Sequence, residues 1–363
     1  MLALRLARGS RPLVQLRRLL VAAASAGTGF LLLYVLAGAV ARPAGSFPRL
    51  LWALVPLAAT VHLAVAVART DPATRPRAGM DAVGLGPVRL SLVAAVSTAV
   101  SCSLGSALAL AAFLHLRGDL GGLPFDGAAA PLLHADRPLP VAAALTLLAV
   151  VPLTASAVTA VALRPHTPPS PSAPPSPHTG LPWGIALTVC GLAVEGYAGR
   201  DGAALPAGWV LTALGLALAG PGLAHACGTL VQAARPGALR LLAGRALQEE
   251  APRIGRPLGV LCAVGAAALS AATLPGPDGP GAPLGPLTGP ACALVTLCAA
   301  ATLLTSAVEV RQNRSAARAA LLDLGTPGTV LRTAAGVRAG ALLTVCVPVS
   351  WAVAQLTSLA LTR

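Results

Sequence analysis

Nine long apolar stretches alternate with short polar segments along this chain. Each stretch has about 17 to 28 residues and few or no charged side chains, which is enough for an α-helix to cross a bilayer. The stretches are residues 19–40, 50–68, 90–116, 140–163, 181–197, 206–233, 258–274, 287–308 and 339–361. Because a segment in hydrocarbon must satisfy its own backbone hydrogen bonds, we predict an all-α, polytopic integral membrane protein with about nine transmembrane helices.

Composition supports this class of protein. The 363 residues are 55% hydrophobic and 10% charged, with a mean hydropathy of +0.76, whereas about a quarter of the residues in a soluble domain are charged. In a soluble protein the net charge of +14 would suggest nucleic-acid binding. Here the basic residues lie in short loops between apolar stretches, where they act as topology signals. We therefore expect the lipid bilayer as a partner, and no nucleic acid.

The distribution of arginine predicts the orientation in the membrane. If the N-terminus is cytoplasmic, the inner segments hold 20 arginines and the outer segments hold 6, as the positive-inside rule requires. The first apolar stretch is long for a signal peptide and another follows it at once, so we expect an uncleaved first helix. The predicted location is the cell membrane, with the N-terminus in the cytoplasm.

Lysine is absent, since all 26 basic residues are arginine. A phosphate-binding loop of the G-x-x-x-x-G-K-[ST] type needs its lysine, so ATP hydrolysis must come from a separate subunit. No Ser/His/Asp, Cys/His or paired-carboxylate pattern of an enzyme is recognisable either. We expect no enzymatic activity and no cofactor. The bias toward Ala, Gly, Pro and Arg is typical of a high-GC bacterial genome, such as that of an actinobacterium.

One polar segment, residues 309–337, occurs twice in related form. Within it, residues 316–324 are helix formers with apolar side chains on one face, and Gly325 and a following proline then break the helix. An offset of 241 residues aligns residues 77–96 with the second part of this segment. The neighbouring apolar stretches are displaced by about the same amount, as expected for a duplicated membrane unit.

Both copies resemble the cytoplasmic segment of FtsX-like permease domains of ABC transporters. In that family an arginine and an L-x-x-L-G-A/T pattern precede the third helix of a four-helix unit. The matching residues are Arg318, Leu321, Leu324 and Gly325, and more weakly Arg77, Met80 and Gly84. The resemblance implies that these residues couple the chain to a separate cytoplasmic ABC ATPase. It also implies a homodimer, or a heterodimer with another permease.

The repeats predict four parts in the chain. Residues 1–163 form a first FtsX-like four-helix unit, and residues 164–180 form a cytoplasmic linker rich in Pro and Ser. A two-helix insert follows at residues 181–233, and residues 234–363 form a second unit with three helices. This order resembles the ten-helix, bacitracin-export type of FtsX-like permease, without its large extracellular domain and without its last helix.

Few ionisable residues lie within the apolar stretches. Glu195 is the one acid inside them, and we treat it as a possible intramembrane polar site, although a residue so near the end of its helix can also reach water. The seven cysteines have no C-x-x-C spacing and are expected to be small packing residues. No metal site is predicted.

These patterns favour one function and leave two alternatives open. The favoured function is a permease subunit that couples ATP hydrolysis in a partner to the export or extraction of a hydrophobic or amphipathic substrate, because the short loops leave no domain to capture a soluble one. A secondary transporter also has internal repeats, but it ordinarily uses acidic or polar groups near the membrane midplane. A degenerate permease could instead serve as a non-transporting scaffold or sensor partner.

Overall fold

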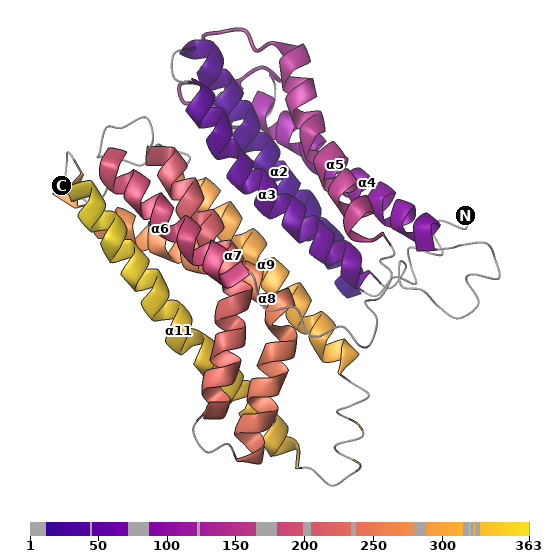
Figure 1. Cartoon of the computed structure of the whole chain (residues 1–363). Helices are drawn as coiled ribbons and strands as arrows, with labels where there is room; N and C mark the ends of the chain where they lie inside the picture. The colour runs from indigo at the N-terminus through magenta and orange to yellow at the C-terminus, as the bar shows by residue number, and fades with distance from the viewer. Residues whose placement is uncertain are drawn as a thin grey trace. The chain divides into compact units, whose positions relative to one another are not determined.

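The computed structural model describes residues 12–43, 46–71, 87–121, 124–164, 180–198, 205–233, 237–273, 275–276, 279–280, 288–314, 319, 323 and 327–362. Nine helices in these ranges are long and apolar enough to cross a membrane. They are α2 (Pro12–Ala41), α3 (Ser46–Thr70), α4 (Pro87–Arg117), α5 (Val141–Ala162), α6 (Gly180–Ala198), α7 (Leu205–Ala233), α8 (Ala238–Thr273), α9 (Thr288–Asn313) and α11 (Gly328–Thr362), shown in Figure 1. Within the same ranges, the strands are β1 (Pro275–Gly276) and β2 (Gly279–Pro280), which pair antiparallel. The predicted class, an all-α multi-pass membrane protein, is confirmed.

Two helices extend well beyond the apolar stretches that predicted them. α8 has 36 residues and continues through Pro252 and Pro257, so several turns with charged side chains precede the predicted span at residue 258. α11 has 35 residues and starts directly after Pro327, well before residue 339. Hydropathy locates the part of a helix that lies in hydrocarbon, whereas the helix itself continues as long as its backbone hydrogen bonds do.

The chain forms two compact units. Unit 1 comprises Met1–Pro168 and Leu287–Thr302, and unit 2 comprises Pro169–Pro286 and Leu303–Arg363. α9 therefore contributes its first part to unit 1 and its last part to unit 2. The four-part division based on repeats stays a prediction.

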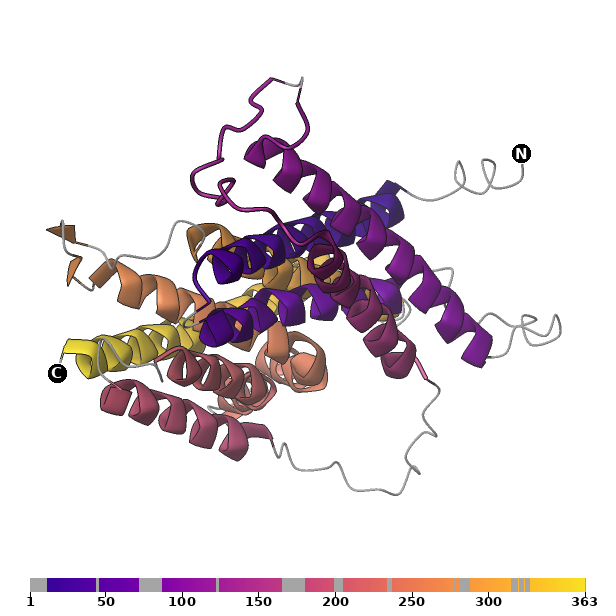
Figure 2. The same ribbon diagram turned by 90° about the horizontal axis from the view of Figure 1, so that it is seen from above.

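In unit 1, α2 packs against α3, α4 and α5 (Figure 1). The contact between α2 and α4 depends on a small residue, because a side chain at Gly105 would overlap Ser25. The Ser25 hydroxyl donates a hydrogen bond to the Cys102 carbonyl at 3.0 Å. Phe30 and Phe113 contact edge to face, with ring centroids 5.5 Å apart. Figure 2 shows the connection between α4 and α5 looping beyond the C-terminal end of α4.

A proline inside α5 has a polar partner on the neighbouring helix. Pro152 lacks an N–H group, so the carbonyl of Leu148, four residues earlier, receives no helical hydrogen bond. The hydroxyl of Ser106 on α4 donates to this carbonyl at 3.4 Å. A side chain from another helix thus satisfies the backbone group that the proline frees, as transmembrane helices require.

In unit 2, α7 packs against both α6 and α8, and α11 packs against α6 and α8. Glycines line the closest approaches. A Cβ atom at Gly184 of α6 would overlap the backbone of Ala219 on α7, and one at Gly255 of α8 would overlap Pro221 on α7. Small residues let helix backbones approach closely in a bilayer, where packing contacts replace the hydrophobic effect as the main attraction.

Candidate functional site

Seven residues predicted to contact an ATPase lie outside the described residues: Arg77, Met80, Gly84, Arg318, Leu321, Leu324 and Gly325. The structure does place the flanks of the second copy. Arg314 directly follows α9, and α11 begins at Gly328. Both flanks of residues 315–327 therefore have defined positions within unit 2.

Charged side chains join these two flanks to α8. Oε1 of Glu250 on α8 lies 3.1 Å from Nη1 of Arg314 and 2.7 Å from Nη1 of Arg338 on α11. Arg314 also contacts Glu249, with its Nη2 2.6 Å from Oε2. The side chain of Glu250 is 12% exposed, so solvent and salt screen its ion pairs less than those of a surface residue. One carboxylate thus holds an arginine on either side of residues 315–327.

A weaker pair lies on the same elements. Nη1 of Arg253 on α8 is 4.0 Å from Oε1 of Glu309 on α9, and Nη2 of Arg314 donates to the Ala246 carbonyl at 3.4 Å. All of these contacts run between elements rather than along α8. Under the predicted topology they lie at the cytoplasmic end of unit 2.

Glu195 is fully buried on α6, with α7 and α11 beside it. Thr212 of α7 donates a hydrogen bond of 2.9 Å to its Oε1, and Thr357 of α11 lies beside the same carboxyl group. Among the described residues, Oε2 has no hydrogen bond of good geometry. The side chain reaches no solvent in this arrangement, although Glu195 lies near the end of its helix.

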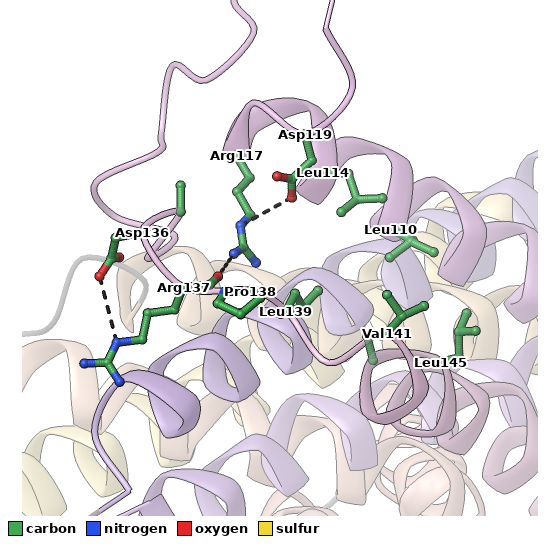
Figure 3. Close-up of a pocket in the computed structure, with 12 residues that line it drawn as sticks. Leu110, Leu114, Arg117, Asp119, Asp136, Arg137, Pro138, Leu139, Val141 and Leu145 are labelled. Atoms are coloured by element: carbon green, nitrogen blue, oxygen red, sulfur yellow. Dashed lines mark hydrogen bonds and ion pairs between the residues drawn. The ribbon is translucent and has the colours of Figure 1, made fainter.

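A cavity of about 380 Å³ lies where α4 ends and α5 begins, as Figure 3 shows. Arg117, the last residue of α4, lines it, and its side chain is 3% exposed. Nη2 of Arg117 donates to the backbone carbonyl of Arg137, and Nε lies 3.3 Å from Oδ2 of Asp119. Within the described residues, Nε has no hydrogen bond of good geometry. Since a guanidinium group carries five N–H donors, this buried cation retains donors for another acceptor.

Asp119, Asp136 and Arg137 also line the cavity, and the remaining lining side chains are apolar. Leu110 and Leu114 contribute from α4, and Val141 and Leu145 contribute from the first turns of α5. Val141 and Leu145 are 67% and 52% exposed, so the apolar wall continues onto the outer surface of α5. An exposed apolar surface on a candidate membrane span is available to lipid or to another helix.

Residues 124–140 of the connection between α4 and α5 are hydrogen-bonded to and packed against the end of α4, next to the cavity. The N–H of Gly127 donates to the His115 carbonyl at 3.1 Å, and the N–H of Ala129 donates to the Leu116 carbonyl at 3.0 Å. Leu133 is buried against the end of α4. The backbone of the loop therefore closes over the last turn of α4.

Arginine counting alone does not single out Arg117, which is one of the six arginines in the predicted outer segments. A signal was present in the sequence. Arg117 ends one apolar stretch with Asp119 two residues later, and Asp136 and Arg137 stand just before the next stretch. Paired charges mark both ends of this loop as polar sites, but burial of Arg117 depends on the fold of the loop.

Metal-binding side chains do not gather in the described part of the chain. It contains no group of three or more His, Cys, Asp or Glu side chains that could hold a metal ion. All seven cysteines are free thiols, and most of them are buried. They lie within helices, where a thiol packs as a small apolar group.

Comparison of the chain with protein-family profiles, with curated proteins and with solved structures finds no match. The fold itself defines the class, which is a multi-pass α-helical membrane protein.

Proposed function

We propose that this protein is the membrane-spanning permease subunit of an ABC transporter. In this proposal a separate cytoplasmic ATPase contacts residues 74–87 and 314–327 and moves the membrane helices when it binds ATP. The supporting observation is the position of Glu250, which contacts Arg314 and Arg338 on either side of residues 315–327. A coupling segment needs firm attachment to the helices that it moves, and three elements of unit 2 meet at this carboxylate.

The ion pairs give the proposed coupling a physical path. A displacement of residues 315–327 changes the position of Arg314, which pairs with Glu249 and Glu250 on α8 and also donates to the Ala246 carbonyl. Because Glu250 also contacts Arg338, α11 is displaced with α8. Packed helices transmit such shifts as rigid bodies because their interfaces resist deformation.

The proposed substrate is hydrophobic or amphipathic and comes from the bilayer. The connections between the described helices leave no extracellular domain large enough to capture a soluble solute. The chain lacks lysine and so cannot form a lysine-dependent phosphate loop, which is why the ATPase is a separate partner. The proposal includes the cell membrane as the location, a cytoplasmic N-terminus, and pairing with a second permease chain.

The experiment co-expresses the chain with an ABC ATPase subunit from the same genome and measures how much ATPase co-purifies with the parent and with two variants. Leu321→Asp places a charge on the apolar face of the predicted docking helix and should weaken association by about 2 to 3 kcal/mol. Gly325→Val should leave association intact and abolish transport, since a β-branched residue strains a sharp turn. Arg240→Gln, on the first turn of α8, removes a charge outside the proposed docking segments and serves as the control.

Two outcomes would count against the proposal. If Leu321→Asp retains the ATPase as well as the parent does, the segment is a loop between helices, and the scaffold alternative gains support. If the purified chain drives uptake into liposomes with an ion gradient and no ATPase, it is a secondary transporter.

A further inference from the structure

We propose that the cavity between the end of α4 and the start of α5 binds the phosphate group of a membrane phospholipid, with an acyl chain along its leucine wall. This inference does not rest on the permease function, because a transporter and a scaffold could both hold such a lipid. Three observations carry it: the position of the cavity at the ends of two candidate membrane spans, the unused donors of Arg117, and the apolar wall that continues onto the outer surface of α5.

The cavity lies at the level of the lipid headgroups. Arg117 is the last residue of the candidate span Arg89–Arg117, and Val141 is the first residue of the candidate span Val141–Ala162. Both residues line the cavity. The boundary between span and loop is where the hydrocarbon ends and phosphate groups begin.

Arg117 has N–H groups that its contacts with the described residues leave unused. Its guanidinium makes one hydrogen bond, to the Arg137 carbonyl, and one ion pair, to Asp119. A phosphate offers several oxygens in the geometry that a guanidinium can bind through two N–H groups at once. Arg137 differs from Arg117, because its side chain is directed away from the leucine wall and pairs with Asp136, as Figure 3 shows.

The apolar wall favours a lipid over a free anion. Leu110, Leu114 and Leu145 lie on the side of the cavity away from Asp136 (Figure 3). A soluble phosphate would gain nothing from these side chains, whereas an acyl chain buries apolar surface against them. The volume of about 380 Å³ is near the lower end for small-molecule sites. It suits the headgroup phosphate and the first part of one chain, with the remainder of the lipid in the bilayer.

The test is native mass spectrometry of the delipidated full chain in detergent, with lipid added at fixed ratios. The probe is phosphatidylglycerol, and a diglucosyl diacylglycerol with the same acyl chains provides a lipid without phosphate. Arg117→Gln should lower the fraction of protein that retains one phosphatidylglycerol about tenfold, which corresponds to about 1.4 kcal/mol. The matched control Arg137→Gln removes the same charge from the same loop and should retain lipid as the parent does. The parent should retain the glycolipid about tenfold less than phosphatidylglycerol, because the glycolipid has no phosphate for Arg117 to bind. This tenfold difference again corresponds to about 1.4 kcal/mol.

Several results would overturn the proposal. Retention of lipid by Arg117→Gln at the level of the parent would contradict it, and so would a loss in Arg137→Gln as large as that in Arg117→Gln. Equal retention of the two lipids would show that the phosphate is not recognised. Displacement of the lipid by millimolar inorganic phosphate would show a soluble-anion site instead. If Arg117→Gln does not fold, Leu145→Trp decides, because it narrows the cavity and leaves Arg117 in place. Unchanged retention in that variant would contradict the acyl-chain position.

Discussion

Oε1 of Glu250 on α8 lies 2.7 Å from Nη1 of Arg338 on α11, and the same oxygen contacts Arg314 at 3.1 Å. Two guanidinium groups from different elements therefore share one carboxylate, and Arg314 has a second partner in Glu249. Loss of a shared partner is more costly than loss of a single pair, because it leaves two partly buried cations close together.

Replacement of Glu250 by Gln should lower the free energy of unfolding of unit 2 by about 1 to 2 kcal/mol, between the values for exposed and buried ion pairs. Thermal unfolding of the purified protein in detergent should show a lower Tm. Arg253→Gln is the control, since its pair with Glu309 spans 4.0 Å and is half exposed. Equal effects of the two substitutions would show that the sharing of Glu250 has no energetic consequence.

Glu195 should tolerate an amide but not truncation. Gln keeps an oxygen that can accept the hydrogen bond from Thr212, and it places no charge among buried side chains, so stability should change by less than about 0.5 kcal/mol. Ala leaves a cavity and an unpartnered Thr212 hydroxyl, at a cost of about 2 to 3 kcal/mol. Thermal unfolding of both variants distinguishes the two cases. A large loss in Glu195→Gln would indicate that the carboxyl group has a role that an amide cannot fill.

Two glycine-to-alanine substitutions should have opposite effects. A Cβ atom at Gly184 overlaps the backbone of Ala219, so α6 and α7 must separate, and we expect a loss of about 1 to 3 kcal/mol. A Cβ atom at Gly340 meets no atom within 4 Å, and alanine there should stabilise α11 by about 0.5 to 1 kcal/mol. Tm values of the two variants check this. Similar Tm values would mean that the α6 and α7 contact adapts without strain.

The orientation predicted from arginine can be tested with single cysteines and a membrane-impermeant thiol reagent. Phe125, on the connection between α4 and α5, is 82% exposed, so Phe125→Cys should be labelled in intact cells. Ser172→Cys, in the predicted cytoplasmic linker, should be labelled only after lysis. The parent chain carries only the native cysteines, which lie in helices, and its labelling gives the background signal. The reverse pattern would place the N-terminus outside and exclude a cytoplasmic ATPase at residues 314–327.

The number and approximate positions of the membrane helices could be predicted because run length and hydropathy are local properties. The full lengths of α8 and α11 could not, since their polar turns resemble loops in composition. The ion-pair partners of Glu250 could not be predicted from the sequence either. Arg245 and Arg253 are its near neighbours in sequence, yet its ion pairs are with Arg314 and Arg338, which only helix packing brings close.

The hydrogen bond from Ser106 to the Leu148 carbonyl makes two positions interdependent during evolution. With proline at position 152, loss of the Ser106 hydroxyl leaves the buried Leu148 carbonyl without a hydrogen bond, at a cost of about 1 to 3 kcal/mol. With alanine at position 152, the carbonyl regains its helical partner, and the same loss becomes nearly neutral. The order of substitution therefore matters: a lineage can discard the serine safely only after it has discarded the proline.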